Sequence, residues 1–307
     1  MLITSFIFKI QRTIEAHWTC YRCLRMLRRD DAYQKFCSDI QILNRKDTVE
    51  KLLREQCSVS RYGDGEFYVM GGSGNGFQQN NAKLAQKLKE ALDNPLPNLL
   101  LCIPRSLVAF GEYNLFSKRF IQNFLCREFR RSVSPYVKTD QVYGDALFTR
   151  FYMNLKDKSN VGEFVSLLKQ LWANRDILIV EGVYSRLGVG NDLFNNAKSI
   201  QRILCPSVNA FDSYDEILEE AKTKGEGKLI ILAIGMTATV LAYDLAKEGL
   251  QALDLGHIDV EYEWFKRKAK TKIPLPYKAV NEAGQNTSIP ECNEPAYKSS
   301  IIKSIGI

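Results

Sequence analysis

Apolar runs of strand length alternate with amphipathic helical patterns through the second half of this chain. Residues 176–182 and 228–234 are largely apolar, as expected of strands buried on both faces. The clearest helical stripe precedes the first of these runs and comprises Phe164, Leu167, Leu168, Leu171 and Trp172. Because parallel strands are joined by crossover helices, this alternation predicts an α/β fold in which helices cover both faces of a mainly parallel sheet.

The first half of the chain shows the same alternation less regularly. Residues 57–60 and 98–103 are predicted strands, and Asp47 is predicted to cap a helix. We divide the 307 residues into a basic helical leader (1–46), an α/β domain (47–268) and a C-terminal extension (269–307) that either wraps around the domain or is loose.

The leader is basic, with nine Lys or Arg residues against four acids up to Lys46, in a chain of net charge +7. No nucleic-acid-binding signature accompanies this charge, so we expect no nucleic acid and favour membrane lipid or a partner protein. Ile3, Ile7, Ile10 and Ile14 recur at helical spacing, as in a helix that lies on a membrane. An ordinary packed helix, or a contact in a homo-oligomer, has the same pattern and is commoner.

No segment resembles a signal peptide, and no apolar run reaches the ~20 residues of a membrane span. The eight cysteines are scattered and several lie in apolar runs, which indicates reduced thiols in a cytoplasmic protein, with the inner face of the cell membrane as a further option. His17, Cys20, Cys23 and Cys37 could be drawn as a zinc site, but a second well-spaced ligand pair is missing.

Two acids follow the first predicted strand of the domain, Asp64 and Glu66, each preceded by a glycine. In an extended backbone alternate side chains share a face, so both carboxylates would point the same way. Such a pair could hold a divalent cation that grips phosphate oxygens, or serve as an acid and a base. An Asp-Gly turn with solvated charges explains the same pattern.

Residues 181–192 form a polar, glycine-rich segment after another predicted strand, at the edge where open parallel sheets bind ligands. Arg186 could neutralise a phosphate there, and the glycines would let backbone N–H groups approach it. A structural loop that needs positive φ at Gly188 and Gly190 is the alternative.

Gly235 ends a third strand, and Thr237 opens the next helix. The free N–H groups of a helix start suit a diphosphate. The pattern G-x-G-x-x-G is absent, so a dinucleotide site is not supported and a mononucleotide diphosphate remains open. Asp254 follows about 20 residues later, where it could bond a ribose hydroxyl.

The segment 256–264 is also rich in titratable groups. If it is extended, His257, Asp259 and Glu261 share one face, and a histidine among acids at a strand exit is a candidate general base. A polar strand edge that leads into a helix is the alternative.

Four motifs occur in one order along the chain: Arg61-Tyr62-Gly63-Asp64-Gly65-Glu66, Gly188-Val189-Gly190-Asn191-Asp192-Leu193-Phe194, Asn209-Ala210-Phe211 before Tyr214, and Gly256-His257-Ile258-Asp259-Val260-Glu261-Tyr262-Glu263-Trp264. Together they resemble the bacterial GT-D-fold glycosyltransferases, formerly a domain of unknown function and linked to glycosylation of serine-rich-repeat adhesins. The resemblance covers residues 49–268. It implies a Rossmann-like GT-D domain that transfers a sugar, with glucose expected, from a UDP-sugar to a hydroxyl of a glycan or glycoprotein.

In that family the D-x-E pair is associated with a divalent metal, which implies Mn²⁺ or Mg²⁺ on Asp64 and Glu66. Met236 departs from the family pattern, where a smaller or stiffer residue is expected, but leaves the backbone donors of the turn intact. The donor-binding residues expected from the patterns and the resemblance together are Arg61, Gly63, Glu181, Arg186, Gly188, Gly190, Asn191, Asp192, Asn209, Gly235, Thr237 and Asp254.

Sugar transfer requires stabilisation of the leaving diphosphate and, if the anomeric centre inverts, a base for the acceptor hydroxyl. The candidate bases are Asp259, Glu261 and His257, in no fixed order. A different hypothesis is a non-catalytic nucleotide-sugar-binding subunit that docks a membrane-associated glycan-assembly partner through the leader. A methyltransferase is disfavoured, because no glycine-rich turn follows an early strand.

Overall fold

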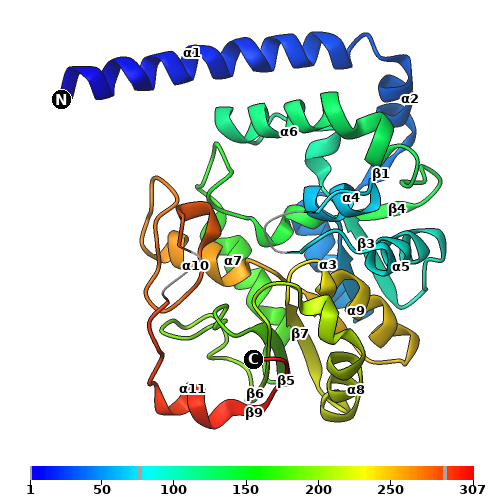
Figure 1. The fold of residues 1–307 in the computed structure, drawn as a ribbon, viewed down its shortest axis with the longest axis vertical. Helices are drawn as coiled ribbons and strands as arrows, with labels where there is room; N and C mark the ends of the chain where they lie inside the picture. Colours follow the sequence, from blue (N-terminus) through cyan, green and yellow to red (C-terminus); the bar gives the residue numbers. More distant parts are fainter. Residues whose placement is uncertain (1, 75–77, 286–288) are drawn as a thin grey trace.

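The computed structural model describes residues 2–74, 78–285 and 289–307, and a parallel sheet with helices on both faces runs through them (Figure 1). Within the described residues the strand order is β1-β4-β3-β2-β8-β7-β5-β6-β9, with every pairing parallel. This confirms the predicted fold class. The strands are β1 (Gln41–Ile42), β2 (Ser58–Arg61), β3 (Leu99–Ile103), β4 (Val142–Asp145), β5 (Asp176–Gly182), β6 (Ser199–Cys205), β7 (Leu229–Ala233), β8 (Ala252–Asp254) and β9 (Ile301–Ser304).

The helices follow the apolar stripes of the sequence, and most begin within a few residues of the predicted position. One detail differs: Asn44, and not Asp47, caps α3, with its side-chain oxygen accepting a hydrogen bond from the Asp47 N–H. The α-helices are α1 (Leu2–Leu27), α2 (Asp31–Asp39), α3 (Arg45–Glu55), α4 (Asp64–Met70), α5 (Ala82–Asp93), α6 (Leu115–Glu128), α7 (Val161–Lys169), α8 (Tyr214–Gly225), α9 (Thr237–Lys247), α10 (Ile258–Lys266) and α11 (Pro295–Ser300).

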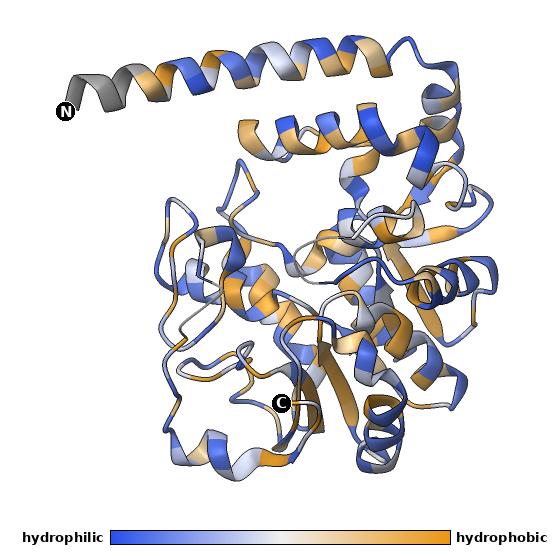
Figure 2. Cartoon of the chain, viewed as in Figure 1, coloured by the Kyte–Doolittle hydropathy of each residue, from blue (hydrophilic) through white to orange (hydrophobic). Residues whose placement is uncertain are grey.

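The strands are buried on both faces, and their side chains alternate between two apolar cores. In β3, Leu99, Leu101 and Ile103 join the core under α5 and α9, while Leu100 and Cys102 join the core under α3, α7 and α10. The hydropathy colouring in Figure 2 accordingly shows the central strands as strongly hydrophobic. This double burial explains why the strands appear in the sequence as continuous apolar runs.

The leader and the extension both contribute to the sheet. The short strand β1 pairs with β4, and β9 pairs with β6 at the opposite edge. Figure 1 shows α1 lying along α6 above the rest of the fold, and the Cys126 thiol of α6 reaches the Cys23 carbonyl of α1 at 3.7 Å. No helix in the described part of the chain is long and apolar enough to cross a membrane.

The centre of the sheet places three strand exits next to one another. The chain runs outward from β2 through β3 to β4, and it later returns through β7 and β8 to the free side of β2. The segments that follow β2, β8 and β7 therefore meet at one edge, where the strand order reverses. Ligands of open α/β sheets bind at such a point.

Candidate active site

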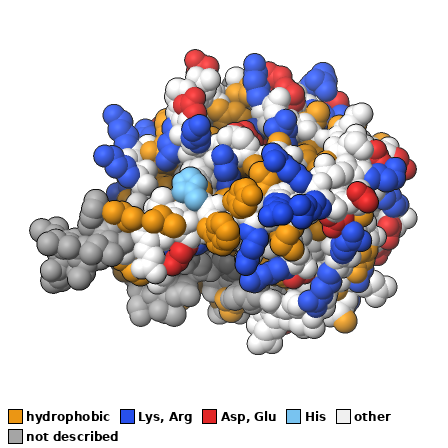
Figure 3. Space-filling model, turned by 90° about the horizontal axis from the view of Figure 1, so that it is seen from above, with side chains coloured by type: hydrophobic (Ala, Val, Ile, Leu, Met, Phe, Trp, Pro, Cys, Tyr) orange, Lys and Arg blue, Asp and Glu red, His pale blue; other side chains and the backbone are white. Residues whose placement is uncertain are grey.

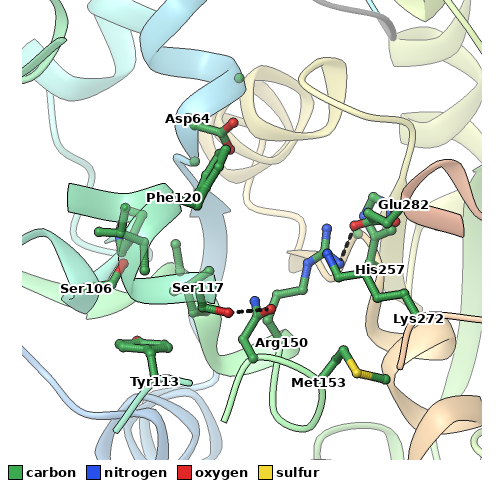
Figure 4. Close-up of a pocket in the computed structure, with 18 of the residues that line it drawn as sticks. Asp64, Ser106, Tyr113, Ser117, Phe120, Arg150, Met153, His257, Lys272 and Glu282 are labelled. Carbon is green, nitrogen blue, oxygen red and sulfur yellow. Dashed lines mark hydrogen bonds and ion pairs between the residues drawn. The ribbon is translucent and has the colours of Figure 1, made fainter. Parts of the chain in front are cut away.

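A cavity of about 2350 Å³ lies at the carboxyl ends of the central strands and extends beneath α1 and α6. One side is formed by the segments that follow β2, β7 and β8, and the other by α6 and α1. Figure 4 shows side chains from both sides facing this space, with Asp64, Phe120, Arg150, His257 and Glu282 among those labelled.

Asp64 and Glu66 do not share one face, because the expected extended backbone is wrong and both residues lie in the first turn of α4. Glu66 Oε2 accepts a hydrogen bond from the Gly63 N–H at 2.7 Å, which caps the helix start. Burial raises the pKa of Glu66 to about 7. The Asp64 carboxylate is open to solvent, yet the surrounding cavity walls desolvate it and raise its pKa. Asp64 is therefore the acid of the pair that is available to a ligand.

Arg61 ties the ends of β2 and β8 together. Its guanidinium pairs with Asp254 at 2.9 Å and donates to Thr149 Oγ1 at 2.8 Å. Burial raises the pKa of Asp254, and Arg61 opposes that shift. Gly256 has φ +48°, and a Cβ at this position would lie 2.1 Å from a guanidinium nitrogen of Arg61, so only glycine fits. Arg61, Gly63 and Asp254 all line the cavity.

The start of α9 forms the neighbouring part of the cavity wall. Gly235 adopts φ +60°, which lets the chain turn sharply from β7 into the helix. Gly235 and Met236 line the cavity. Thr237 is 1% exposed, and its Oγ1 makes no hydrogen bond to any residue that the structure describes. The N–H groups of Ala238 and Thr239 are bonded to the carbonyls of Gly235 and Met236, so the partial positive charge of the helix start, rather than a full set of free donors, is what suits an anionic ligand here.

Arg150 is a cavity residue that the sequence analysis missed. It lies five residues beyond the end of β4, in a stretch without a glycine motif, and its guanidinium is 2.7 Å from Glu282 and 3.9 Å from Glu261. Burial alone would lower its pKa, but Glu282, Glu261 and Asp64 raise it, so Arg150 stays charged. Its only sequence signal is a basic residue shortly after an apolar strand.

His257 and Glu282 complete this charged cluster. The His257 Nε2 lies 3.7 Å from Glu282 Oε2. Burial and the nearby Arg150 charge lower the pKa of His257 to about 3. Burial would raise the pKa of Glu282, but Arg150 and His257 outweigh it and lower that pKa to about 2. At neutral pH the cluster consists of a charged arginine, a charged carboxylate and a neutral histidine.

The predicted common face of His257, Asp259 and Glu261 is also wrong, because residues 258–266 form α10. Asp259 Oδ1 accepts hydrogen bonds from the Gly188 N–H and from Asn191, each at 2.8 Å, while its Oδ2 pairs with Lys278. Because Glu261 follows Asp259 by two residues in a helix, its side chain leaves the opposite side of α10.

Glu261 Oε2 accepts the backbone N–H groups of Tyr152 at 2.9 Å and Met153 at 2.8 Å. Asp259 and Glu261 are both buried. Both oxygens of Asp259 are engaged, whereas Glu261 Oε1 has no hydrogen-bond partner among the described residues but is buried outside the cavity lining.

The charged side chains of segment 181–192 do not form the expected phosphate site. They support the alternative interpretation, a structural loop. Glu181 pairs with Arg202 and accepts the Leu187 N–H at 2.7 Å. Arg186 does not face the cavity as expected. It is 5% exposed and donates to the backbone carbonyls of Tyr277 at 2.6 Å and Pro290 at 2.7 Å. Arg186 thereby fastens the C-terminal extension.

The rest of this segment binds α10. Asn191 donates to Glu263 at 2.7 Å, and Asp192 accepts a hydrogen bond from the Tyr262 hydroxyl at 2.8 Å. Gly188 and Gly190 each have φ +74°. Asn209 also lies away from the cavity wall and accepts the Gln79 N–H at 2.9 Å. Of the residues expected to bind the donor, the structure brings Arg61, Gly63, Gly235 and Asp254 to the cavity, with Thr237 directly behind it.

Metal-ligating side chains do not cluster in residues 2–74, 78–285 and 289–307, where no group of three His, Cys, Asp or Glu was found. Cys20 and Cys23, considered above as zinc ligands, lie on successive turns of α1, and the Cys20 thiol faces the Leu115 carbonyl. A cation at Asp64 would therefore take further oxygen ligands from a bound substrate and water. Mg²⁺ and similar ions commonly bind through one or two carboxylates and substrate phosphates, so Asp64 fits such a site.

Residues 59–283 match the family described as Glycosyltransferase GT-D fold. The chain belongs to this family. The match extends beyond the predicted limit at residue 268 and includes the part of the extension that carries Lys278 and Glu282. In this GT-D chain, the motif at Arg61–Glu66 contacts the last motif because the Arg61 guanidinium packs against Gly256. The motif at Gly188–Asp192 contacts α10 through the hydrogen bond from the Gly188 N–H to Asp259.

Two curated streptococcal proteins are similar to this chain. A probable glycosyl transferase Gly of Streptococcus gordonii is 36% identical over 269 residues, which are 87% of this chain and 39% of that protein. Glycosyltransferase GlyD of Streptococcus pneumoniae is 34% identical over 285 residues, which are 92% of this chain and 34% of that protein. The chain thus spans well under half the length of either relative.

Solved structures of the family share the fold. A structure described as a highly conserved domain of unknown function with a distinct glycosyltransferase fold superimposes with a TM-score of 0.85 at 36% identity, covering 90% of this chain and 100% of that one. A glycosyltransferase from Streptococcus sanguinis gives a TM-score of 0.83 at 36% identity, covering 87% and 99% of the two chains.

Proposed function

We propose that this chain is a metal-assisted glycosyltransferase that moves a sugar from a UDP-sugar to an acceptor hydroxyl. The observation that carries the proposal is the position of Asp64, an accessible carboxylate beside Arg150 and close to the ends of β7 and β8, in a cavity of a GT-D-family chain. Glucose is the expected sugar, and a glycan or glycoprotein is the expected acceptor.

The donor diphosphate is assigned to the start of α9. A helix start carries partial positive charge, and α9 presents its start to the cavity through Gly235 and Met236, while the Thr237 hydroxyl is buried behind them. Arg150 supplies a full positive charge from another wall of the same cavity. Because negative charge develops on the leaving UDP, fixed donors aimed at it would lower the barrier to transfer.

Asp64 is the residue that would hold Mn²⁺ or Mg²⁺, with Glu66 capping the helix that presents it. Such a cation, when bound, would neutralise charge on the diphosphate. Glu66 has one oxygen engaged by Gly63, so its role here is to fix the position of Asp64.

The acceptor is assigned to the α6 side of the cavity. The cavity of about 2350 Å³ is larger than the ~300–1,000 Å³ typical of a site for one small molecule, so it has room for two substrates. Phe116 and Phe120 line that side, are exposed and could stack against sugar rings. We assign proton transfer to none of the three predicted bases. Both oxygens of Asp259 are bonded, Glu261 is buried outside the cavity lining, and a neutral histidine with a pKa of about 3 is a weak base.

The proposal is tested by incubating the protein with UDP-glucose, UDP-galactose and UDP-N-acetylglucosamine in the presence of Mn²⁺ and measuring UDP release. The unchanged protein should release UDP from at least one donor, and Asp64→Ala should lower that rate by about 100-fold or more at an unchanged melting temperature. Asp39→Ala, on the exposed end of α2, is the control and should keep full activity.

Failure to release UDP from any donor, or undiminished release by Asp64→Ala, would refute the proposal. UDP binding without any turnover would instead support the non-catalytic subunit.

A further inference from the structure

The outer face of α1 carries an apolar stripe that no described residue covers. The inner face, with Ala16, Cys23 and Leu27 buried, packs toward α6. At about 100° per residue the stripe falls on one arc, roughly 80° wide, on the opposite side of the helix. Its members are 44% to 64% exposed and comprise Ile10, Ile14, Trp18 and Tyr21.

Positive charge continues this stripe toward the end of the helix. Arg22, Arg25, Arg28 and Arg29 are all exposed, and none forms a salt bridge with a carboxylate of the described residues. The only acid within α1 is Glu15, which lies about 60° outside the apolar arc. The surface is therefore apolar and cationic, with no carboxylate on its central arc.

Helix α6 adds further exposed aromatic side chains on the side of α1 that packs toward it. Phe116 and Phe120 are exposed, and the guanidinium groups of Arg12 and Arg119 lie 5.4 and 5.8 Å from the centre of the Phe116 ring. Figure 3, which looks down on this side of the molecule, shows hydrophobic and basic side chains next to one another across the face. Phe116, Phe120 and Tyr21 also line the cavity, so the cavity borders this surface.

We propose that the outer face of α1 forms a docking surface for a membrane that contains anionic lipids. Tryptophan and tyrosine favour the boundary between lipid headgroups and acyl chains, and exposed arginines favour the negative surface of such a membrane. A protein partner would need carboxylates to match the four unpaired arginines, whereas a sheet of anionic headgroups supplies that charge at any orientation. This proposal is independent of the proposed sugar transfer.

Trp18 provides a direct probe of the surface. The chain has three tryptophans, and the other two, Trp172 and Trp264, are fully buried. Vesicles of phosphatidylglycerol in phosphatidylcholine should therefore shift the emission of Trp18 to shorter wavelength and carry the full chain into the vesicle pellet. Vesicles of phosphatidylcholine alone should do neither. Trp18→Phe should lose most of the emission change but still sediment with the anionic vesicles.

Two double variants separate the contributions of charge and apolar surface. Arg25→Glu with Arg28→Glu should lower partitioning into anionic vesicles by about 30-fold or more. Ile10→Glu with Ile14→Glu should lower it as well, because both side chains leave the apolar arc. The charge-matched control is Lys46→Glu with Lys83→Glu, at exposed positions in the first turns of α3 and α5, where acids suit the helix.

The control pair should bind as the unchanged protein does. The emission of Trp172 and Trp264 and the melting temperature report that each variant is folded. Three results would overturn the proposal: no binding to anionic vesicles, an equal loss in the control pair, or self-association in sedimentation velocity that Ile10→Glu with Ile14→Glu abolishes while vesicle binding is absent. The last result would show that a second copy covers the face.

Discussion

Two polar, glycine-containing segments follow strands of the same sheet, but their charged side chains have different roles. Residues 61–66 after β2 and residues 181–192 after β5 both combine glycines with charged side chains, and both were expected to meet a phosphate. In the first segment the Asp64 carboxylate remains open to the cavity. In the second, Glu181, Arg186 and Asp192 are each bonded within the protein.

The difference comes from the neighbours of each strand. The exit of β2 lies beside the exits of β8 and β7, at the point where the strand order reverses and a crevice opens. After β5, Gly182, Tyr184, Ser185 and Leu187 also line the cavity, but the charged side chains of the segment are engaged elsewhere, and carbonyl groups of the extension occupy Arg186. Which charged groups remain free is therefore decided by what packs over each strand exit.

Lys278→Met should lower the free energy of unfolding by about 3–5 kcal/mol, because it leaves Asp259 buried without its cation. Urea unfolding followed by tryptophan fluorescence measures the change. Lys272→Met is the matched control, since Lys272 is exposed at the cavity and its loss should leave stability nearly unchanged. Equal changes in the free energy of unfolding for the two substitutions would show that the Lys278–Asp259 pair does not stabilise the packing of segment 181–192.

Arg150→Lys should lower kcat/KM for the UDP-sugar by about 100-fold, because lysine keeps the charge but loses the planar fork of donors. Steady-state UDP release gives the ratio. Arg175→Lys, at a partly buried arginine bonded to Gln251 away from the cavity, should leave kcat/KM unchanged. An unchanged kcat/KM for Arg150→Lys would remove Arg150 from the proposed donor site.

Arg186→Met should lower the free energy of unfolding by about 2 kcal/mol through the loss of two hydrogen bonds from a charged group. It should also make the extension more sensitive to protease while leaving the affinity for UDP unchanged. Calorimetric titration with UDP and limited proteolysis measure the two effects. A loss of UDP affinity at unchanged stability would return Arg186 to the role of a phosphate ligand.

His257→Gln should flatten the dependence of stability on pH. The pKa of His257 is lowered to about 3 in the folded protein, so its neutral form stabilises the fold above the ordinary histidine pKa of ~6.5, and this stability is lost as the pH falls. The side chain is 31% exposed, so we expect only ~1 kcal/mol between pH 7 and pH 5. Urea unfolding at both pH values should show a smaller decrease for His257→Gln, and an equal decrease would contradict the assignment.

The sheet was predictable because burial on both faces leaves continuous apolar runs in the sequence. β5 was placed without error, and β7 was placed to within one residue at each end. The two segments that were predicted to be extended, at Asp64–Glu66 and at His257–Glu261, are instead the starts of helices α4 and α10. Glu66 three residues after Gly63 and before an apolar run is a capping pattern, and Asp259 and Glu261 at the start of α10 with Lys266 in its last turn match the helix dipole.

The bonding state of each side chain was not predictable from the motifs. Arg186 and Arg150 are both arginines shortly after strands, and only the fold shows that one fastens Tyr277 and Pro290 while the other lines the cavity. Glu282 and Lys278 come from an extension that was expected to wrap around the domain or be loose. Glu282 pairs with Arg150, more than a hundred residues away in the sequence, and Lys278 pairs with Asp259, about 20 residues away. No local pattern reveals either pair.

The central claim is that Asp64, and no residue of segment 181–192, provides the metal-dependent part of the donor site. Calorimetric titration of UDP with Mn²⁺ and then with a chelator, on the unchanged protein and on Asp64→Asn, tests it most directly. Mn²⁺ should tighten UDP binding by about tenfold or more in the unchanged protein. That gain should vanish in Asp64→Asn at an equal melting temperature. An undiminished Mn²⁺-dependent gain in Asp64→Asn would contradict the account.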